Sequence, residues 1–338
     1  MSTLSRRRFI QAATAVGAGL ILAPAVIGRV RAQAPITLTV ASLFGEDKPE
    51  TQIWHHIRDI VAEKLPGQFH FNIVGNAALG GEKQVAEGIR LGSVQASLST
   101  VSALSGWVPE AQLLDLPFLF RDAAHVRATV GGTVGAELKE KFAAQNFVVL
   151  DFINYGARHL LTKKPVTEPA QLAGKRIRVI QTPLHTGLWS AFGMTPIGIP
   201  IPETYNALQT GVADAMDLTK SAYAGFRLYE VVPYLTETGH IWASGVVYFS
   251  ASFWNGLNAE QQEVFRAAAS AGAAHFNELI VADEARSMAL AAQHGGEVLQ
   301  PEDRAQWEEG ARDVWQDFAA VVGGRDKIEA IRQAGGAG

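Results

Sequence analysis

One segment, from Gly174 to Asp217, constrains the possible fold more strongly than any other part of the sequence. It reads as strand, helix, strand, helix, strand, because Pro183 suits a first helical turn and Gly211 ends the second helix. The strands are expected over Ile177–Ile180, Thr195–Ile199 and Ala213–Met216. Arg178 lies within the first of these apolar strands. A buried guanidinium without a partner costs several kcal/mol, so Arg178 requires a carboxylate or another anion beside it.

The first 34 residues have the features of an export signal. Ser5–Gln11 fits the twin-arginine motif, Ala12–Ile27 is apolar and rich in small residues, and Ala32–Ala34 reads as an A-x-A cleavage site. An uncleaved anchor or a basic tail are the alternatives, although the apolar stretch is short for a membrane span. We expect twin-arginine export, cleavage near Ala34, a periplasmic mature protein and no stable membrane insertion.

The mature chain is expected to be acidic. Residues 1–34 contain five arginines and no acidic residue, so removing them changes the formal net charge from −4 to about −9. An acidic protein without a basic patch is poorly suited to nucleic acid or to anionic membranes. The sequence has no cysteine, which excludes disulfides and thiolate metal sites. Its partners should be small molecules or another protein.

Alternating strands and helices predict an α/β fold along the rest of the chain. Before the central segment, strands are expected over Ile36–Ala41, Phe69–Val74, Gln95–Thr100 and Phe147–Ile153, and helices over Pro49–Lys64, Gly81–Leu91 and Asp122–Gln145. After it, strands are expected over Thr236–His240 and Val246–Ser250, and helices over Ala259–His294 and Pro301–Val322. We expect mixed, mostly parallel sheets with flanking helices.

A short internal similarity favours two lobes. Ile89–Ala96 and Leu208–Ala215 each read as a helix end, a glycine, a turn and a strand. At 338 residues and 48% apolar composition, the chain is long enough for two domains. The expected lobes are 35–155 with part of 240–338, and 156–240 with part of 241–338. A hinge would join them, and a ligand would bind in the crevice between them.

Sequence motifs give little support to catalysis. The sequence has no G-x-S-x-G elbow, no P-loop and no G-x-G-x-x-G after the first expected strand. His55 and His56 form the only adjacent histidine pair and lack a third ligand at metal-site spacing, so we interpret them as a solvated helix face. We therefore expect no enzyme activity, no metal and no cofactor.

Two arginines carry the strongest functional signal. Arg178 lies in the expected strand, and Arg158 lies in the extended segment Gly156–Leu161. The planar guanidinium matches a carboxylate, often through two parallel hydrogen bonds. Ligand capture is one explanation, and an internal ion pair with Asp217 or Glu203 is the other. Composition and spacing leave both open.

From Arg158 to His240 the sequence resembles the solute-binding proteins of TRAP transporters, the tripartite ATP-independent periplasmic carriers (DctP family). The main matches are Leu172–Val179, Leu188–Pro196, Pro202–Ala215 and Phe226–Val231, and weaker matches are Leu79–Glu82, Leu91–Gln95 and Leu116–Phe120. They occur in order and span nearly the whole mature chain. The resemblance implies a two-lobed periplasmic binding-protein fold.

The resemblance also implies a set of ligand-binding residues. The arginine that anchors the substrate carboxylate in the family falls on Arg178, and a second arginine used by many members falls on Arg158. Other pocket positions of the family fall on Thr100, with Ser99 beside it, and on His240. The anchor makes a carboxylate ligand the expected one.

The sequence departs from the family at Asp217-Leu218-Thr219, where many members have Glu-Asn-Pro. This difference puts in doubt the contacts typical of C4-dicarboxylate or sialic-acid binding. Asp217 can accept a hydrogen bond from a ligand hydroxyl, bind a cation or pair with Lys220. Gln181 completes the candidate binding set. Three aromatic residues can wall the cleft or simply pack in the core: Phe44, Trp242 and Tyr223.

The expected function is capture of a small organic acid in the periplasm and delivery to TRAP membrane permease subunits. Hinge closure over the ligand would be the mechanism, since the closed state contacts the acid from both lobes. Two alternatives stay open: a sensor subunit that hands its ligand to a receptor, and a twin-arginine-exported enzyme. The sequence does not identify the acid.

Overall fold

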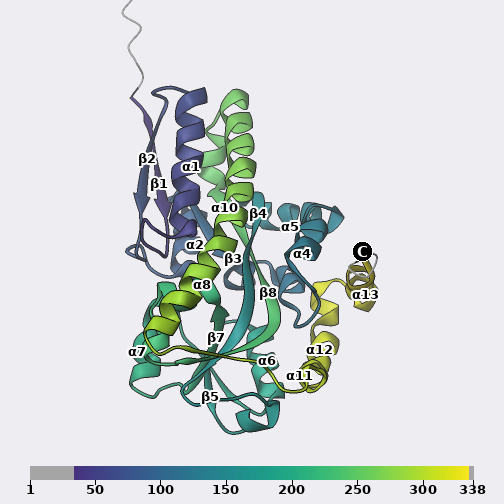
Figure 1. Ribbon diagram of the computed structural model, residues 1–338. Coiled ribbons are helices and arrows are strands. Elements are labelled where there is room, and N and C mark those ends of the chain that lie inside the picture. The colour runs from purple at the N-terminus through teal and green to yellow at the C-terminus, as the bar shows by residue number, and fades with distance from the viewer. Residues whose placement is uncertain (1–33, 335–338) are drawn as a thin grey trace, which may run out of the picture. The chain divides into compact units, whose positions relative to one another are not determined.

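A nine-stranded mixed sheet organises residues 34–334, the part of the chain that the computed structural model describes (Figure 1). The strands lie in the order β2-β1-β3-β8-β4-β7-β5-β6, and β9 pairs with β8. Their bounds are β1 Ile36–Ala41, β2 Phe69–Val74, β3 Ala96–Thr100, β4 Phe147–Thr162, β5 Arg176–Val179, β6 Thr195–Gly198, β7 Ala215–Thr219, β8 Tyr234–Ser250 and β9 Glu297–Leu299.

Two long antiparallel strands, β4 and β8, form the middle of the sheet. On one side, β1 pairs in parallel with β2 and β3; on the other, β5 pairs in parallel with β6 and β7. The long strands join these groups through antiparallel pairs, β3 with β8 and β4 with β7. The α/β fold with a mixed sheet is confirmed. The two groups belong to one continuous sheet, because β4 and β8 extend through positions at which the sequence suggested breaks.

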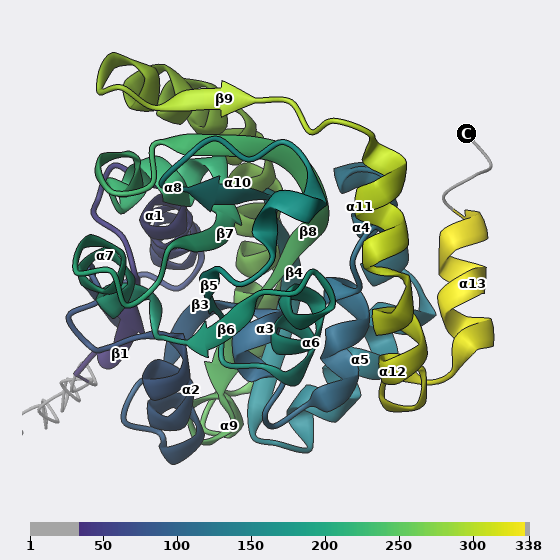
Figure 2. The same cartoon turned by 90° about the horizontal axis from the view of Figure 1, so that it is seen from below.

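Helices cover both faces of the sheet, and α11, α12 and α13 lie outside α4 and α5 on the right of Figure 2. Those before β5 are α1 Pro49–Lys64, α2 Glu82–Leu91, α3 Val101–Leu104, α4 Ala123–Val130 and α5 Thr133–Ala143. Those after it are α6 Pro183–Ala191, α7 Ile201–Gln209, α8 Lys220–Gly225, α9 Ala251–Asn255, α10 Ala259–Gln293, α11 Arg304–Gly310, α12 Arg312–Val322 and α13 Arg325–Ala334. Short 3-10 helices are η1 Pro109–Asp115, η2 Pro169–Leu172 and η3 Leu228–Glu230.

Helices α1 and α10 lie side by side (Figure 1). The buried face of α1 carries Ile53, Trp54, Ile57 and Val61 at helical spacing, and these pack in one core cluster with Phe276 of α10. Among residues 34–334, no helix combines the length and the apolar composition that a membrane span requires. The predicted signal peptide lies outside the described residues, except for Ala34.

Two predicted helices are wrong in their extent. Asp122–Gln145 is divided into α4 and α5, because the chain turns at Gly131-Gly132 and the helix restarts at Thr133. Pro301–Val322 is likewise divided into α11 and α12, and helix formation starts only at Arg304. The chain changes direction at each break, and the following helix packs its own apolar face.

The internal similarity seen in the sequence corresponds to matching structure. Helix α2 ends at Gly92 and is followed by β3, and α7 ends near Gly211 and is followed by β7. Both glycines have φ of 79°, a left-handed conformation that glycine adopts without strain. These turns start β3, which ends at Thr100, and β7, which carries Asp217 at its centre.

Candidate ligand-binding cavity

An inner cavity of about 60 Å³ lies against the buried arginines of β4 and β5. Its walls come from the β1–α1 loop, α1, the start of α2, strands β3, β4, β5, β7 and β8, and helices α7 and α8. An outer groove of about 190 Å³ shares Glu82, Arg178, Ile180 and Ile201 with it. Arg178 therefore stands where the inner cavity meets the outer groove.

Arg178 is a buried cation with an incomplete set of partners. Its side chain is on β5, the residue is 3% exposed, and its Nε donates to the carbonyl of Ile199 at 2.8 Å. It forms no ion pair with any carboxylate of residues 34–334. Burial, and then the charge of Arg158, lower the pKa of Arg178 to about 10, so it remains protonated at neutral pH. The position suits a bound anion.

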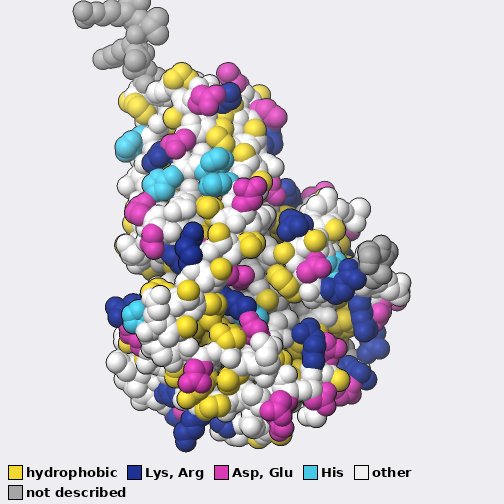
Figure 3. Space-filling view, viewed as in Figure 1, with side chains coloured by type: hydrophobic (Ala, Val, Ile, Leu, Met, Phe, Trp, Pro, Cys, Tyr) yellow, Lys and Arg dark blue, Asp and Glu magenta, His cyan; other side chains and the backbone are white. Residues whose placement is uncertain are grey.

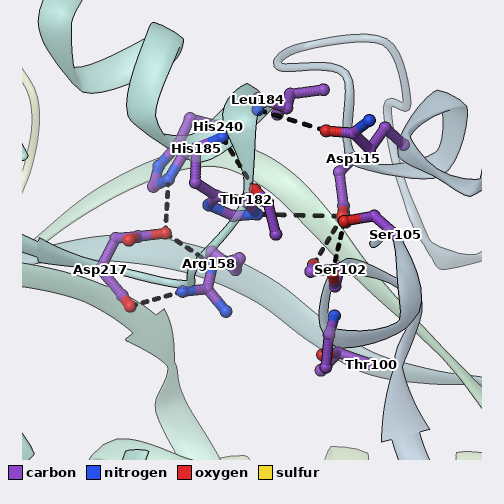
Figure 4. A network of polar contacts seen from close by, with 12 residues as sticks. Thr100, Ser102, Ser105, Asp115, Arg158, Thr182, Leu184, His185, Asp217 and His240 are labelled. Atoms are coloured by element: carbon purple, nitrogen blue, oxygen red, sulfur yellow. Dashed lines mark hydrogen bonds and ion pairs between the residues drawn. The ribbon is translucent and has the colours of Figure 1, made fainter. Parts of the chain in front are cut away.

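Arg158 is held by an ion pair behind the cavity wall (Figure 4). Its Nε donates to Asp217 Oδ2 at 2.6 Å, and its Nη2 donates to the Asp217 carbonyl at 2.6 Å. Asp217 is fully buried on β7, which pairs antiparallel with β4. Burial favours the neutral acid, but the Arg158 charge and the His240 hydrogen bond hold the pKa of Asp217 well below its usual range.

His240 completes this network from β8. Its Nε2 lies 3.2 Å from Asp217 Oδ2, and its Nδ1 lies 2.7 Å from the Thr238 hydroxyl. Burial lowers the pKa of His240, so the ring is neutral at pH 7, donates to the carboxylate and accepts from Thr238. Three central strands thereby fix the position of the Arg158 guanidinium.

A second polar cluster lies beside this network (Figure 4). The Ser102 hydroxyl donates to Asp115 Oδ2 at 2.5 Å, and His185 Nε2 lies 3.8 Å from the same oxygen. Thr182 caps α6 by accepting from the His185 backbone N–H at 3.1 Å. These contacts join α3, η1 and the start of α6 behind the cavity.

Thr100 and Glu82 form another polar part of the wall. The backbone N–H of Thr100, at the end of β3, donates to Glu82 Oε1 at 2.6 Å. The Thr100 hydroxyl caps α3 by accepting from Ala103 N–H at 3.3 Å. Burial raises the pKa of Glu82, against the opposing effect of its hydrogen bonds and of the two arginines.

Most of the remaining wall is apolar. Phe44 and Phe226 face each other with ring centroids 4.5 Å apart, and Leu98, Ile180 and Leu218 add aliphatic surface. Pockets of this kind, apolar with a few convergent polar groups, are typical of small-molecule sites. Arg178, which has no carboxylate partner among residues 34–334, is the wall residue best suited to an anion.

Comparison with known proteins decides the family. The family model described as "Bacterial extracellular solute-binding protein, family 7" (DctP) matches residues 40–321. The chain belongs to this family. The uncharacterized protein y4mM of Sinorhizobium fredii is 35% identical over 271 residues, which cover 80% of this chain and 49% of that protein. The chain thus spans about half the length of that relative.

Two solved structures of TRAP periplasmic solute-binding proteins show the same fold. One from Shewanella oneidensis, with bound succinate, has a TM-score of 0.85 at 25% identity, covering 89% of this chain and 100% of that one. One from Bradyrhizobium sp., in complex with α/β-D-galacturonate, has a TM-score of 0.83 at 28% identity, covering 88% and 99%. The family and the fold are those of solute-binding proteins rather than enzymes.

The DctP-family fold brings only some of the predicted site residues to the cavity. Three line the inner cavity: Arg178, Arg158 and Thr100. Gln181 is exposed and lines the outer groove. Three are buried without lining either space: Ser99, Asp217 and His240. The Ser99 hydroxyl lies 3.0 Å from the Tyr248 hydroxyl, so it is engaged within the core.

The structure shows the contacts of Asp217 and of the three aromatic residues, for which the sequence left alternatives open. Asp217 pairs with Arg158, whereas Lys220 pairs with Glu237. Phe44 lines the cavity, while Trp242 packs against the core and Tyr223 is fully buried. The sequence interpretation missed Glu50, which lies on the cavity wall. Its helical spacing from Ile53 and Ile57 places Glu50 on the buried face of α1. This spacing can be read from the sequence and could have identified Glu50.

The adjacent histidines of α1 lie away from the cavity. Histidine side chains gather over α1 and α10 on the face seen in Figure 3. There the rings of His56 and His275 stack with centroids 4.5 Å apart, and His55 bonds to Glu46 and Arg58. Within residues 34–334, no group of three or more histidine or acidic side chains has the arrangement of a metal site.

Proposed function

We propose that this chain is the periplasmic receptor of a TRAP-type transporter, which captures a small organic acid and delivers it to membrane permease subunits. One observation carries the proposal: Arg178 is a buried, protonated guanidinium at a cavity, and its bonded partner in residues 34–334 is a backbone carbonyl. A ligand carboxylate supplies the missing counter-charge and accepts hydrogen bonds from the planar fork.

The other predicted residues act around this anchor. Arg158, held by Asp217 and His240, adds positive potential, and Thr100 offers its hydroxyl to the ligand. Gln181 contacts the acid from the outer groove. Ser99 positions the β3 strand behind the wall through its contact with Tyr248.

The mechanism is closure of two lobes, 35–155 and 156–240, each with part of the C-terminal region. Wall residues from both support this proposal: Phe44 and Leu98 precede residue 156, whereas Arg178 and Phe226 follow it. An acid that contacts both lobes stabilises the closed state in proportion to its differential affinity. Export by the twin-arginine pathway, with cleavage near Ala34, would place the receptor in the periplasm.

A thermal-shift screen of organic acids on three proteins tests the anchor. A ligand at 100 times its Kd stabilises the wild type by about 2.7 kcal/mol. Arg178→Ala should lose this response, since truncating one partner of a buried charge pair costs about 2–5 kcal/mol of binding. Arg176→Ala is the matched control, because Arg176 lies two residues away on β5, is exposed and pairs with Asp214. Equal stabilisation of wild type and Arg178→Ala by the same acid would refute the anchor.

A further inference from the structure

The inner cavity has a composition that bears on which acid it accepts. Seven of its wall residues have large apolar side chains: Leu43, Phe44, Leu98, Ile180, Ile201, Leu218 and Phe226. Its volume of about 60 Å³ is room for about five water molecules. Hydroxyl groups placed against such walls would lose their hydrogen bonds to water without replacement. The part of the ligand that enters the cavity must therefore be small and apolar.

Several polar side chains on the wall already have partners, whereas the hydroxyls of Tyr155 and Thr219 have none among residues 34–334. The Thr100 hydroxyl caps α3, the Ser42 hydroxyl lies 2.8 Å from the Thr51 hydroxyl, and Arg158 is bonded to Asp217. A polyhydroxylated acid would require several free donors and acceptors at these positions. The wall supplies only the O–H groups of Thr100, Tyr155 and Thr219, so it is poorly suited to such a ligand.

Two acidic side chains also face the cavity. Glu50, at the start of α1, is 4% exposed, and its Oε2 has no hydrogen-bond partner among the described residues. Glu82 lies at the start of α2 and accepts the Thr100 N–H. Burial raises the pKa of Glu50 to about 7, which reflects how poorly this position tolerates negative charge. A second carboxylate on the ligand would enter the same unfavourable environment.

We infer that the ligand of Arg178 is a monocarboxylate with an apolar body, and that Glu50 rejects acids that carry a second carboxylate. The inference rests on the proposed function, because it places the ligand carboxylate on Arg178. Glu50 disfavours a dicarboxylate by like-charge repulsion, which is strong because Glu50 is almost completely buried. It thereby sets specificity without contacting the anchored carboxylate.

Isothermal titration of four acids into the purified protein at about pH 8, where Glu50 is largely ionised, tests the inference. The probes are 3-methylbutanoate, succinate, D-galacturonate and L-valine. The wild type should bind 3-methylbutanoate at least about tenfold more tightly than succinate, and Glu50→Gln should reduce this ratio about tenfold by improving succinate binding. Glu46→Gln is the matched control, since Glu46 has a 68% exposed side chain outside the inner cavity, and should leave the ratio unchanged.

Glu50→Met removes the same charge with an apolar side chain of similar length and replaces Glu50→Gln if that variant does not fold. If succinate or D-galacturonate binds more tightly than 3-methylbutanoate, and Arg178→Ala removes this binding, the inference is wrong and the proposed function stands. Tighter binding of L-valine than of 3-methylbutanoate also overturns it, because Glu50 would then pair with an ammonium group. Absence of binding by every acid contradicts the proposed function, and the inference falls with it.

Discussion

At the scale of single residues, the Arg158–Asp217 pair shows how burial changes the value of a salt bridge. Both side chains are almost inaccessible to water, so removing one charge leaves the other without a counter-ion. Arg176 of β5 and Asp214, which directly precedes β7, form a chemically similar pair at 2.9 Å, but their side chains are 47% and 33% exposed. The two pairs therefore form an internal comparison.

We predict that Asp217→Asn lowers the free energy of unfolding by about 3–5 kcal/mol, the usual effect of breaking a buried ion pair. Asp214→Asn should lower it by less than about 1 kcal/mol, since exposed pairs contribute little. Urea denaturation of both variants measures the difference. Equal losses would mean that Arg158 gains little from its buried partner.

Glu50 gives a pH dependence whose sign follows from its raised pKa. The carboxyl ionises near pH 7 in the folded protein but near 4.3 in the unfolded chain. The folded state therefore binds more protons between these values, and stability is lost as the pH rises through about 7. A shift of this size corresponds to about 3 kcal/mol.

We predict that raising the pH from 5 to 8 stabilises Glu50→Gln relative to the wild type by about 3 kcal/mol in the free energy of unfolding. Both proteins are measured without ligand. Taking the difference cancels groups shared by both proteins, such as Glu82. Chemical denaturation across this range gives the difference. A constant difference would show that Glu50 ionises normally in the folded state.

At the scale of elements, the α4–α5 junction requires a residue without a side chain. A Cβ added at Gly135 would lie 1.8 Å from the Val130 carbonyl oxygen, so the backbone would have to move. We predict that Gly135→Ala lowers the free energy of unfolding by about 1–3 kcal/mol, as overpacking does. Gly106→Ala should change it by less than about 0.5 kcal/mol, because Gly106 is exposed and its Cβ would have no neighbour within 4 Å.

Both variants are measured by urea denaturation. A loss at Gly106 as large as that at Gly135 would indicate that the helix junction is not the cause. The same junction explains the wrong helix prediction over 122–145, since the apolar spacing of α4 and α5 is helical on both sides of the turn.

Local patterns predicted most elements, including the ends of α1 and β2, because helical and strand periodicity depend on nearby residues. They did not predict the continuity of β4 and β8. The register of this pair shifts around Gly156, whose φ is 94°, as in a β-bulge. A glycine at a bulge reads as a strand end in the sequence. Only pairing with a distant strand shows that the strand continues.

The same distinction applies to the candidate site. Arg178 and Arg158 were predicted because a charge inside an apolar strand is unusual by itself, and the family resemblance gave it a role. The apolar walls were not predictable, since Phe44 and Phe226 meet only after folding. Asp217 was predicted as a candidate, but its engagement with Arg158 depends on the register of β4 and β7.

At the scale of the whole molecule, the outer groove is bounded by two segments that are far apart in the sequence. Gly81, before α2, lies close to the start of α7: a Cβ at Gly81 would be 3.5 Å from Pro202 Cδ and 3.8 Å from Pro200 Cβ. Arg178 lines the same groove. In the proposed mechanism this contact forms when the lobes close over the acid.

A bulky side chain at Gly81 should therefore hold the segments apart. We predict that Gly81→Trp weakens acid binding about tenfold or more, since apparent affinity falls with the population of the closed state. The stability of the ligand-free protein should change little, because the open state accommodates the indole. Gly106→Trp, at an exposed turn with no neighbour within 4 Å of its Cβ, is the control.

Titration calorimetry gives the affinity, and solution X-ray scattering should show compaction on ligand addition in the wild type and the control only. If Gly81→Trp binds the acid as tightly as the wild type and becomes equally compact, the prediction is wrong. The closing motion, or the entrance to the site, would then lie elsewhere in the molecule.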